Sequence, residues 1–129
     1  MAAAATTYNL RRDGIVAVGF SNGANIAASL LLRRPGVLRG AVLLSPMVPF
    51  EPSAPPELAG TSVFIGAGRS DSMVPQSQVV RLVEILREAG AEVTLHWSPS
   101  GHEITTGVVG AAQEWLTQHV AAVGAAARY

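Results

Sequence analysis

Residues 15–25, which read I-V-A-V-G-F-S-N-G-A-N, predict how the rest of the chain is arranged. An apolar run ends at Gly19, Ser21 lies between two glycines, and an alanine- and leucine-rich pattern of helical period follows at once. A strand, a sharp turn and a helix in this order place the serine hydroxyl at the apex, where glycines let strand and helix approach closely. We therefore expect Ser21 to be a nucleophile if the chain also supplies a base and an acid. The alternative is an ordinary glycine-rich turn.

The composition predicts a single domain over residues 1–129. Hydrophobic residues make up 49% of the chain, charged residues 14%, and the formal net charge is zero, which argues against disorder and gives no reason to expect a nucleic acid or a membrane as partner. No apolar run is long enough to span a bilayer, and the first residues lack the features of a signal peptide, so we expect a cytoplasmic location. The absence of cysteine excludes disulfides and thiolate metal sites, and no cofactor or metal site is visible.

Apolar runs separated by crossover segments predict an α/β fold with a parallel sheet of about four strands and three to four helices. The expected strands are residues 15–20, 41–44, 62–67 and 92–97, and the expected helices are residues 2–10, 24–33, 75–89 and 103–123. Residues 46–60 contain five prolines, a density that predicts an irregular loop. Its apolar members Met47, Val48 and Phe50 either line a pocket or pack the loop against the domain.

Three loops that follow predicted strands carry Ser21, Asp71 and His102. Because a parallel α/β sheet keeps its chemistry beyond the carboxyl ends of its strands, we expect these side chains to converge on one edge. Few other residues compete for the roles of acid and base, because the chain has two aspartates and three histidines. Of these, only Asp71 and His102 lie in loops that follow predicted strands. His102 would take the proton of Ser21, and Asp71 would hold the imidazole in the correct tautomer. The N–H of Asn22, at the head of the helix, is the expected oxyanion donor.

Three motifs together resemble the α/β-hydrolase superfamily. They are G-F-S-N-G-A-N-I-A-A-S at 19–29, V-F-I-G-A-G-R-S-D-S-M-V-P at 63–75 and H-W-S-P-S-G-H-E at 96–103. The sequence is most similar to the small carboxylesterase and phospholipase group related to dienelactone hydrolase. The resemblance implies a serine hydrolase of small carboxylic esters with Ser21, Asp71 and His102 as its triad. Met47, Met73 and Val74 are the candidate substrate-binding residues.

The resemblance covers only the C-terminal half of the family's fold of about eight strands. The early strands and a loop that supplies the second oxyanion donor in the family have no counterpart here, so the chain is either a portion of a larger hydrolase or a naturally short one. The strand Ile15–Phe20 would then be an exposed, apolar sheet edge. We expect a homodimer that uses this edge or the surface beside it.

Two alternatives to a small-ester esterase stay open. The first is a catalytically weak or incompetent half-domain that serves as an assembly module. The second is thioester hydrolysis or acyl transfer by the same three residues, which the sequence does not distinguish from ester hydrolysis.

Overall fold

The computed structural model describes residues 6–9 and 15–127, with the side chains of residues 15–119. Five strands and three helices follow one another in this part of the chain. In chain order they are β1 (Thr6–Asn9), β2 (Ile15–Phe20), α1 (Asn22–Arg33), β3 (Leu38–Leu44), β4 (Ser62–Gly68), α2 (Gln76–Glu88), β5 (Glu92–Ser98) and α3 (Thr106–Ala127).

The strands form one sheet in the order β1-β2-β3-β4-β5. Strands β2 to β5 are parallel neighbours, each joined to the next by a crossover segment. The register is regular from Val16↔Gly40 to Phe20↔Leu44, after one irregularity at the start of β2. The expected α/β fold, with a parallel sheet of four strands and three helices, is confirmed.

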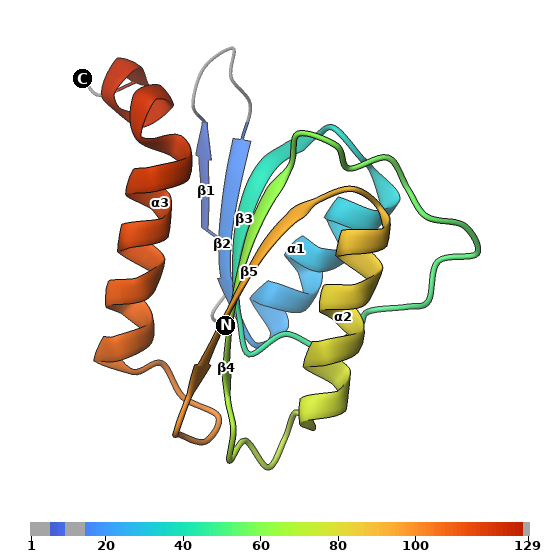
Figure 1. Cartoon of the computed structure of the whole chain (residues 1–129), viewed down its shortest axis with the longest axis vertical. Coiled ribbons are helices and arrows are strands. Elements are labelled where there is room, and N and C mark those ends of the chain that lie inside the picture. The colour runs from blue at the N-terminus through green and yellow to red at the C-terminus, as the bar shows by residue number, and fades with distance from the viewer. Residues whose placement is uncertain (1–5, 10–14, 128–129) are drawn as a thin grey trace.

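Helices α1 and α2 cover one face of the sheet and α3 covers the other, as Figure 1 shows. Side chains of β4 alternate between the two layers: Val63 and Ile65 belong to the larger buried cluster with α1 and α2, whereas Phe64 packs with Trp115 of α3. Burial on both faces explains why the parallel strands are almost continuously apolar in the sequence.

The expected helix at residues 2–10 is wrong where the structure describes it, because Thr6–Asn9 is the strand β1. This strand pairs with β2 in antiparallel register, from Thr6↔Val18 to Asn9↔Ile15. Two threonines and a tyrosine favour a strand, and the backbone N–H and C=O groups of β2 supply the partner. The alanine-rich start that suggested a helix lies outside the described residues.

The pairing of β1 also corrects a second expectation. Ile15–Phe20 is not an edge, because β2 has β1 on one side and β3 on the other. The edges of the sheet within the described part of the chain are β1 and β5.

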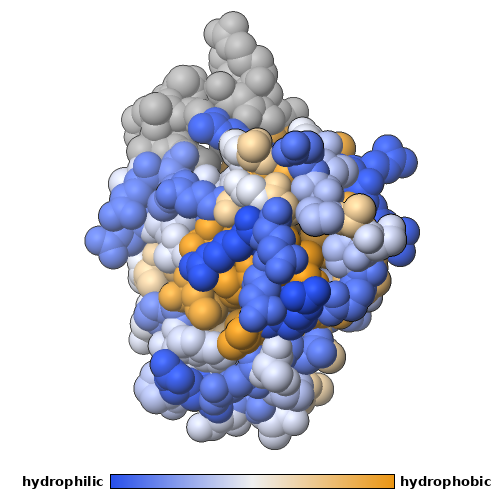
Figure 2. Space-filling view, turned by 45° about the vertical axis from the view of Figure 1, so that its right-hand side comes forward, coloured by the Kyte–Doolittle hydropathy of each residue, from blue (hydrophilic) through white to orange (hydrophobic). Residues whose placement is uncertain are grey.

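The long connection between β3 and β4 contains neither helix nor strand over residues 46–60. It is nonetheless packed down, since Met47, Val48 and Phe50 contact the larger buried cluster. Figure 2 shows apolar surface in the middle of one face of the molecule, crossed and surrounded by hydrophilic side chains. The apolar area on this face is therefore divided into small parts.

A substitution at Gly19 tests the close packing of β2 against α1. A Cβ atom at Gly19 would lie 2.5 Å from the carbonyl carbon of Gly23, so the strand or the helix would have to move. We expect Gly19→Ala to lower the free energy of unfolding by about 1–3 kcal/mol, measured by urea denaturation. Gly110→Ala is the control: a Cβ there meets nothing within 4 Å. Helix propensity predicts that this control is stabilised by up to about 1 kcal/mol. A wild-type midpoint for Gly19→Ala would contradict the packing.

Candidate active site

Ser21 is the single residue between β2 and α1, and its backbone is strained. It has φ 57° and ψ −114°, a conformation that costs a residue with a side chain about 1–3 kcal/mol. Two hydrogen bonds hold the turn: the N–H of Ser21 donates to the carbonyl of Leu44 at 2.8 Å, and the N–H of Asn25 donates to the carbonyl of Ser21 at 3.0 Å. The turn is thus fixed between β3 and α1.

The ends of the neighbouring strands are aligned by similar bonds. The N–H of Ser45, after β3, donates to Gly66 at 2.7 Å, and the N–H of Arg69, after β4, donates to Ser98 at 2.8 Å. Ser45 also has a positive φ, of 56°. The loops that carry functional side chains therefore leave the sheet from one continuous, hydrogen-bonded edge.

The side chains of Ser21 and His102 meet at this edge although they are 81 residues apart in the chain. The Oγ of Ser21 lies 2.9 Å from Nε2 of His102. The imidazole side chain is 15% exposed, so the contact is partly shielded from water. A hydroxyl this close to an imidazole nitrogen can pass its proton along the hydrogen bond.

Asp71 completes the arrangement on the far side of the imidazole. Its Oδ2 lies 2.7 Å from Nδ1 of His102, and its side chain is only 2% exposed. An ionised carboxylate accepts hydrogen bonds and donates none, so Nδ1 of a neutral His102 carries the proton. Nε2 is then free to accept the proton of Ser21.

Asp71 is held in its ionised form by its surroundings. Burial acts most strongly on its pKa and would raise it, but hydrogen bonds from His102 and from the N–H groups of Met73 and Val74 outweigh burial, and the pKa is lowered. The two N–H groups donate to Oδ1 at 2.8 and 2.9 Å. The carboxylate is therefore charged at neutral pH. Because Oδ1 accepts both backbone hydrogen bonds, the carboxylate is held with Oδ2 toward His102.

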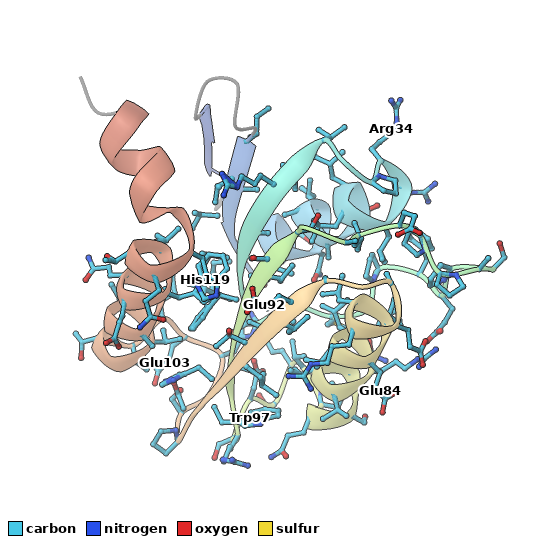
Figure 3. The ribbon with its side chains drawn as sticks, turned by 45° about the horizontal axis from the view of Figure 1, so that its top comes forward. Arg34, Glu84, Glu92, Trp97, Glu103 and His119 are labelled. Carbon is cyan, nitrogen blue, oxygen red and sulfur yellow. The ribbon has the colours of Figure 1, made fainter. Side chains whose placement is uncertain are left out.

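The other two histidines have different surroundings. Figure 3 shows His119 on α3 and Glu92 on β5, whose Nε2 and Oε1 atoms are 3.6 Å apart. His119 also contacts the carbonyl of Trp115 through Nδ1, at 3.0 Å. His96 stacks on Phe64 in the sheet. Their hydrogen bonds and ring contacts are with other groups, so among the described residues His102 alone joins Ser21 to Asp71.

Two supporting features of the His102 loop were missed in the sequence. The ring of Phe20 lies 5.2 Å from the imidazole of His102 between centroids and limits its movement. Gly68, at the end of β4, lies so close to the backbone of Ser100 and Gly101 that a Cβ there would strike both. In the sequence, the only signal for Phe20 is its place between Gly19 and Ser21. No sequence pattern indicates that Gly68 lies against Gly101.

The expected binding residues lie around this edge. Asn22 is the first residue of α1, where backbone N–H groups have no partner within the helix. Met73 is 66% exposed and Met47 is partly buried, whereas the side chain of Val74 is buried in the core. Roles for these residues in binding substrate or oxyanion stay predictions.

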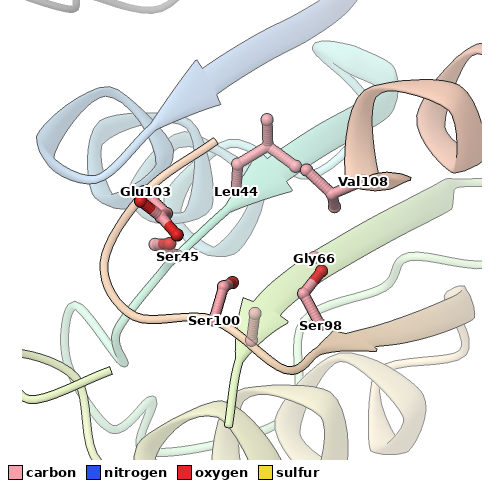
Figure 4. A pocket seen from close by; sticks show the side chains of 8 residues that line it. Leu44, Ser45, Gly66, Ser98, Ser100, Glu103 and Val108 are labelled. Atoms are coloured by element: carbon pink, nitrogen blue, oxygen red, sulfur yellow. The ribbon is translucent and has the colours of Figure 1, made fainter. Parts of the chain in front are cut away.

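A small cavity lies behind the His102 loop. Figure 4 shows it between the ends of β3 and β4 and the loop that follows β5, with Ser98, Ser100 and Glu103 among its lining. It holds about 10 Å³, enough for one water molecule. The Oγ of Ser100 is buried beside it and has no hydrogen-bond partner in the described part of the chain. This cavity is too small to hold an ester.

The described residues contain no group of three or more His, Cys, Asp or Glu side chains that could hold a metal ion. None of the helices in residues 6–9 and 15–127 is both long enough and apolar enough to cross a bilayer. The cytoplasmic location expected from the sequence stays a prediction.

Known proteins resemble this chain in sequence and in structure. The Bacillus subtilis protein MhqD, which is named as a hydrolase, is 42% identical over 117 residues, which are 91% of this chain and 58% of that protein. The crystal structure of a Bacillus cereus carboxylesterase matches with 47% identity and a TM-score of 0.82, over 84% of this chain and 51% of its own. A carboxylesterase from Mesorhizobium loti matches with 39% identity and a TM-score of 0.72, over 78% and 47%.

The chain spans about half the length of these relatives. A family model described as phospholipase/carboxylesterase matches residues 2–120, nearly the whole chain. This chain therefore belongs to the phospholipase/carboxylesterase family of α/β hydrolases.

Proposed function

We propose that this protein hydrolyses small carboxylic esters through an acyl-serine intermediate, with Ser21, His102 and Asp71 as its catalytic triad. The observation that carries the proposal is the continuous pair of hydrogen bonds from Ser21 Oγ to His102 and from His102 to Asp71, at 2.9 and 2.7 Å. Its family, whose relatives include carboxylesterases, supports the same reaction.

In the acylation step, Ser21 Oγ attacks the ester carbonyl carbon while Nε2 of His102 takes its proton. The carbonyl π electrons move to oxygen, and the N–H of Asn22 donates to this oxyanion; such a donor contributes roughly 3 kcal/mol to lowering the barrier. The tetrahedral intermediate then expels the alcohol, which receives the proton from His102. Asp71 remains ionised and stabilises the imidazolium throughout.

Deacylation repeats these steps with water. The oxygen of water attacks the acyl-serine carbonyl while His102 takes a proton from this water. The proton then passes to Ser21 Oγ as the bond between Oγ and the acyl carbon breaks. The products are the carboxylic acid and free enzyme. No metal ion or organic cofactor takes part in this mechanism.

The length of the chain favours a second candidate. Since it spans about half of its relatives, it could be an assembly module with weak or no activity by itself. The N–H of Asn22, at the start of α1, is the proposed oxyanion donor. We assign no described residue as a second donor. The two candidates differ in whether Ser21 is reactive in the isolated protein.

We also propose that the chain forms a homodimer, through the surface beside β2 rather than through the edge of β2. Val18, Val42 and Leu44 of the sheet form an open groove of about 360 Å³ with Val109 and Leu116 of α3. Contiguous apolar surface that stays open to solvent is a common feature of protein–protein interfaces. A second copy of the chain, related by a two-fold axis, would cover both grooves at once.

Labelling with a fluorophosphonate, which reacts with activated serines, tests the triad. We expect one adduct, on Ser21, located by peptide mass spectrometry. His102→Ala should slow labelling by about 10³-fold or more, because the serine loses its base. His119→Ala is the matched control, since His119 contacts Glu92 and Trp115 and lies outside the triad; it should label at the wild-type rate.

Two results would contradict the triad. One is equal labelling of wild type and His102→Ala; the other is a folded wild-type protein that neither labels nor releases p-nitrophenol from short acyl esters. The second result would favour the assembly module.

Sedimentation velocity at micromolar concentration tests the homodimer. We expect a dimer for the wild type and a monomer for Val109→Glu, because a charge in the groove opposes its burial. Val109 is 39% exposed, and Val37→Glu, at a 42% exposed valine that does not line the groove, is the matched control that should stay dimeric. A monodisperse wild-type monomer would rule this interface out.

A further inference from the structure

The proline-rich loop is anchored at its start by two side-chain amides. Oδ1 of Asn25, on α1, accepts a hydrogen bond from the N–H of Met47 at 2.8 Å. Oε1 of Gln78, on α2, accepts one from the N–H of Val48 at 3.0 Å. Two helices on the same face of the sheet thus hold consecutive residues of one loop.

These two bonds satisfy every backbone N–H group in the segment P-M-V-P at residues 46–49. Pro46 and Pro49 have no N–H, and the segment belongs to neither helix nor strand. Met47 and Val48 are both partly buried against the core, so their N–H groups need partners within the protein. Asn25 and Gln78 are those partners.

Asn25 also belongs to the turn that carries Ser21. Its own N–H donates to the carbonyl of Ser21, while its side chain binds Met47. Ser21 in turn donates to Leu44, three residues before Met47. A closed set of hydrogen bonds therefore connects the candidate nucleophile, the first turn of α1 and the start of the loop.

The loop has outer contacts as well, and these are weaker. Arg81 pairs with Glu51 at 2.8 Å, but the side chains are 39% and 57% exposed. The guanidinium of Arg33 lies 4.5 Å from the ring centroid of Phe50. Exposed ion pairs contribute little to holding a backbone in place, so among the polar contacts of this loop the two amide side chains restrain it most.

We propose that Asn25 and Gln78 are positioning residues that fix the backbone of Met47 and Val48 as one wall of the acyl subsite beside Ser21. This inference rests on the proposed ester hydrolysis. The hydrogen bonds of Asn25 tie the backbone of Met47 to the turn that carries Ser21, so the position of this wall relative to the serine is restrained. We expect a restrained wall to discriminate against long acyl groups.

The experiment compares variants that lose the acceptor oxygen with variants that keep it. Asn25→Leu and Gln78→Met remove the acceptor at similar size, whereas Asn25→Asp and Gln78→Glu retain it. Arg81→Gln, which removes only the exposed ion pair with Glu51, is the control. Hydrogen exchange read by mass spectrometry is well suited here, because residues 46–49 contain only the two N–H groups in question.

We expect exchange of the 46–49 segment to be about tenfold faster in Asn25→Leu and Gln78→Met, because each releases one partly buried hydrogen bond. The ratio of kcat/KM for p-nitrophenyl acetate over octanoate should fall by about the same factor, mainly through KM for octanoate. Asn25→Asp, Gln78→Glu and Arg81→Gln should keep the wild-type exchange rate and the wild-type ratio.

Unchanged exchange in Asn25→Leu and Gln78→Met would overturn the anchoring, and faster exchange with an unchanged ester ratio would overturn the role in acyl selection. A wild-type chain that protects the segment but hydrolyses neither ester would overturn the proposed function, and the acyl subsite with it. The exchange measurement needs no activity, so the two failures are distinguishable.

Discussion

The strained turn at Ser21 is the constraint on which the rest of the structure depends. A positive φ at a residue with a side chain persists only where its surroundings compensate for the strain. Here β3 accepts the N–H of Ser21, α1 donates to its carbonyl, and Gly19 allows the strand to lie against Gly23 of the helix. These contacts require β2 to pair with β3 and α1 to pack across the sheet. The parallel register of β2 with β3 meets the first requirement, and the buried face of α1 meets the second.

The electrostatics of the site follow from the same arrangement. Asp71 and His102 lie on loops after β4 and β5, and the bonds between strand ends bring these loops beside Ser21. Asp71 stays ionised although it is buried, because three donors act on its carboxylate, and this leaves Nδ1 of His102 protonated. All three side chains come from this one chain, which spans only half the length of its relatives.

The sequence predicted the four parallel strands because apolar runs buried on two faces are a local signal. It also placed Ser21, Asp71 and His102 in loops at one edge, since the few aspartates and histidines left little choice. The sequence did not predict β1, because the alanine-rich pattern beside it favoured a helix over the strand that Thr6 and Thr7 favour. The strand is stabilised by pairing with β2, which no local pattern specifies. The sequence also missed Phe20 beside His102, and Asn25 and Gln78 beneath the loop. These contacts join a side chain to a group 22 to 82 residues away, and only the folded chain brings them together.

The central claim is that the folded chain holds His102 between Asp71 and Ser21, ready to accept the serine proton. The tautomer of His102 tests this most directly, and ¹⁵N-labelled protein in a long-range ¹H–¹⁵N spectrum reports it without any substrate. A neutral histidine ring carries its proton on one of its two nitrogens, and this spectrum shows which one. The hydrogen bond to the ionised Asp71 predicts that His102 carries its proton on Nδ1, with Nε2 unprotonated and facing Ser21. A His102 with its proton on Nε2, or a mixture of both tautomers, would contradict the account.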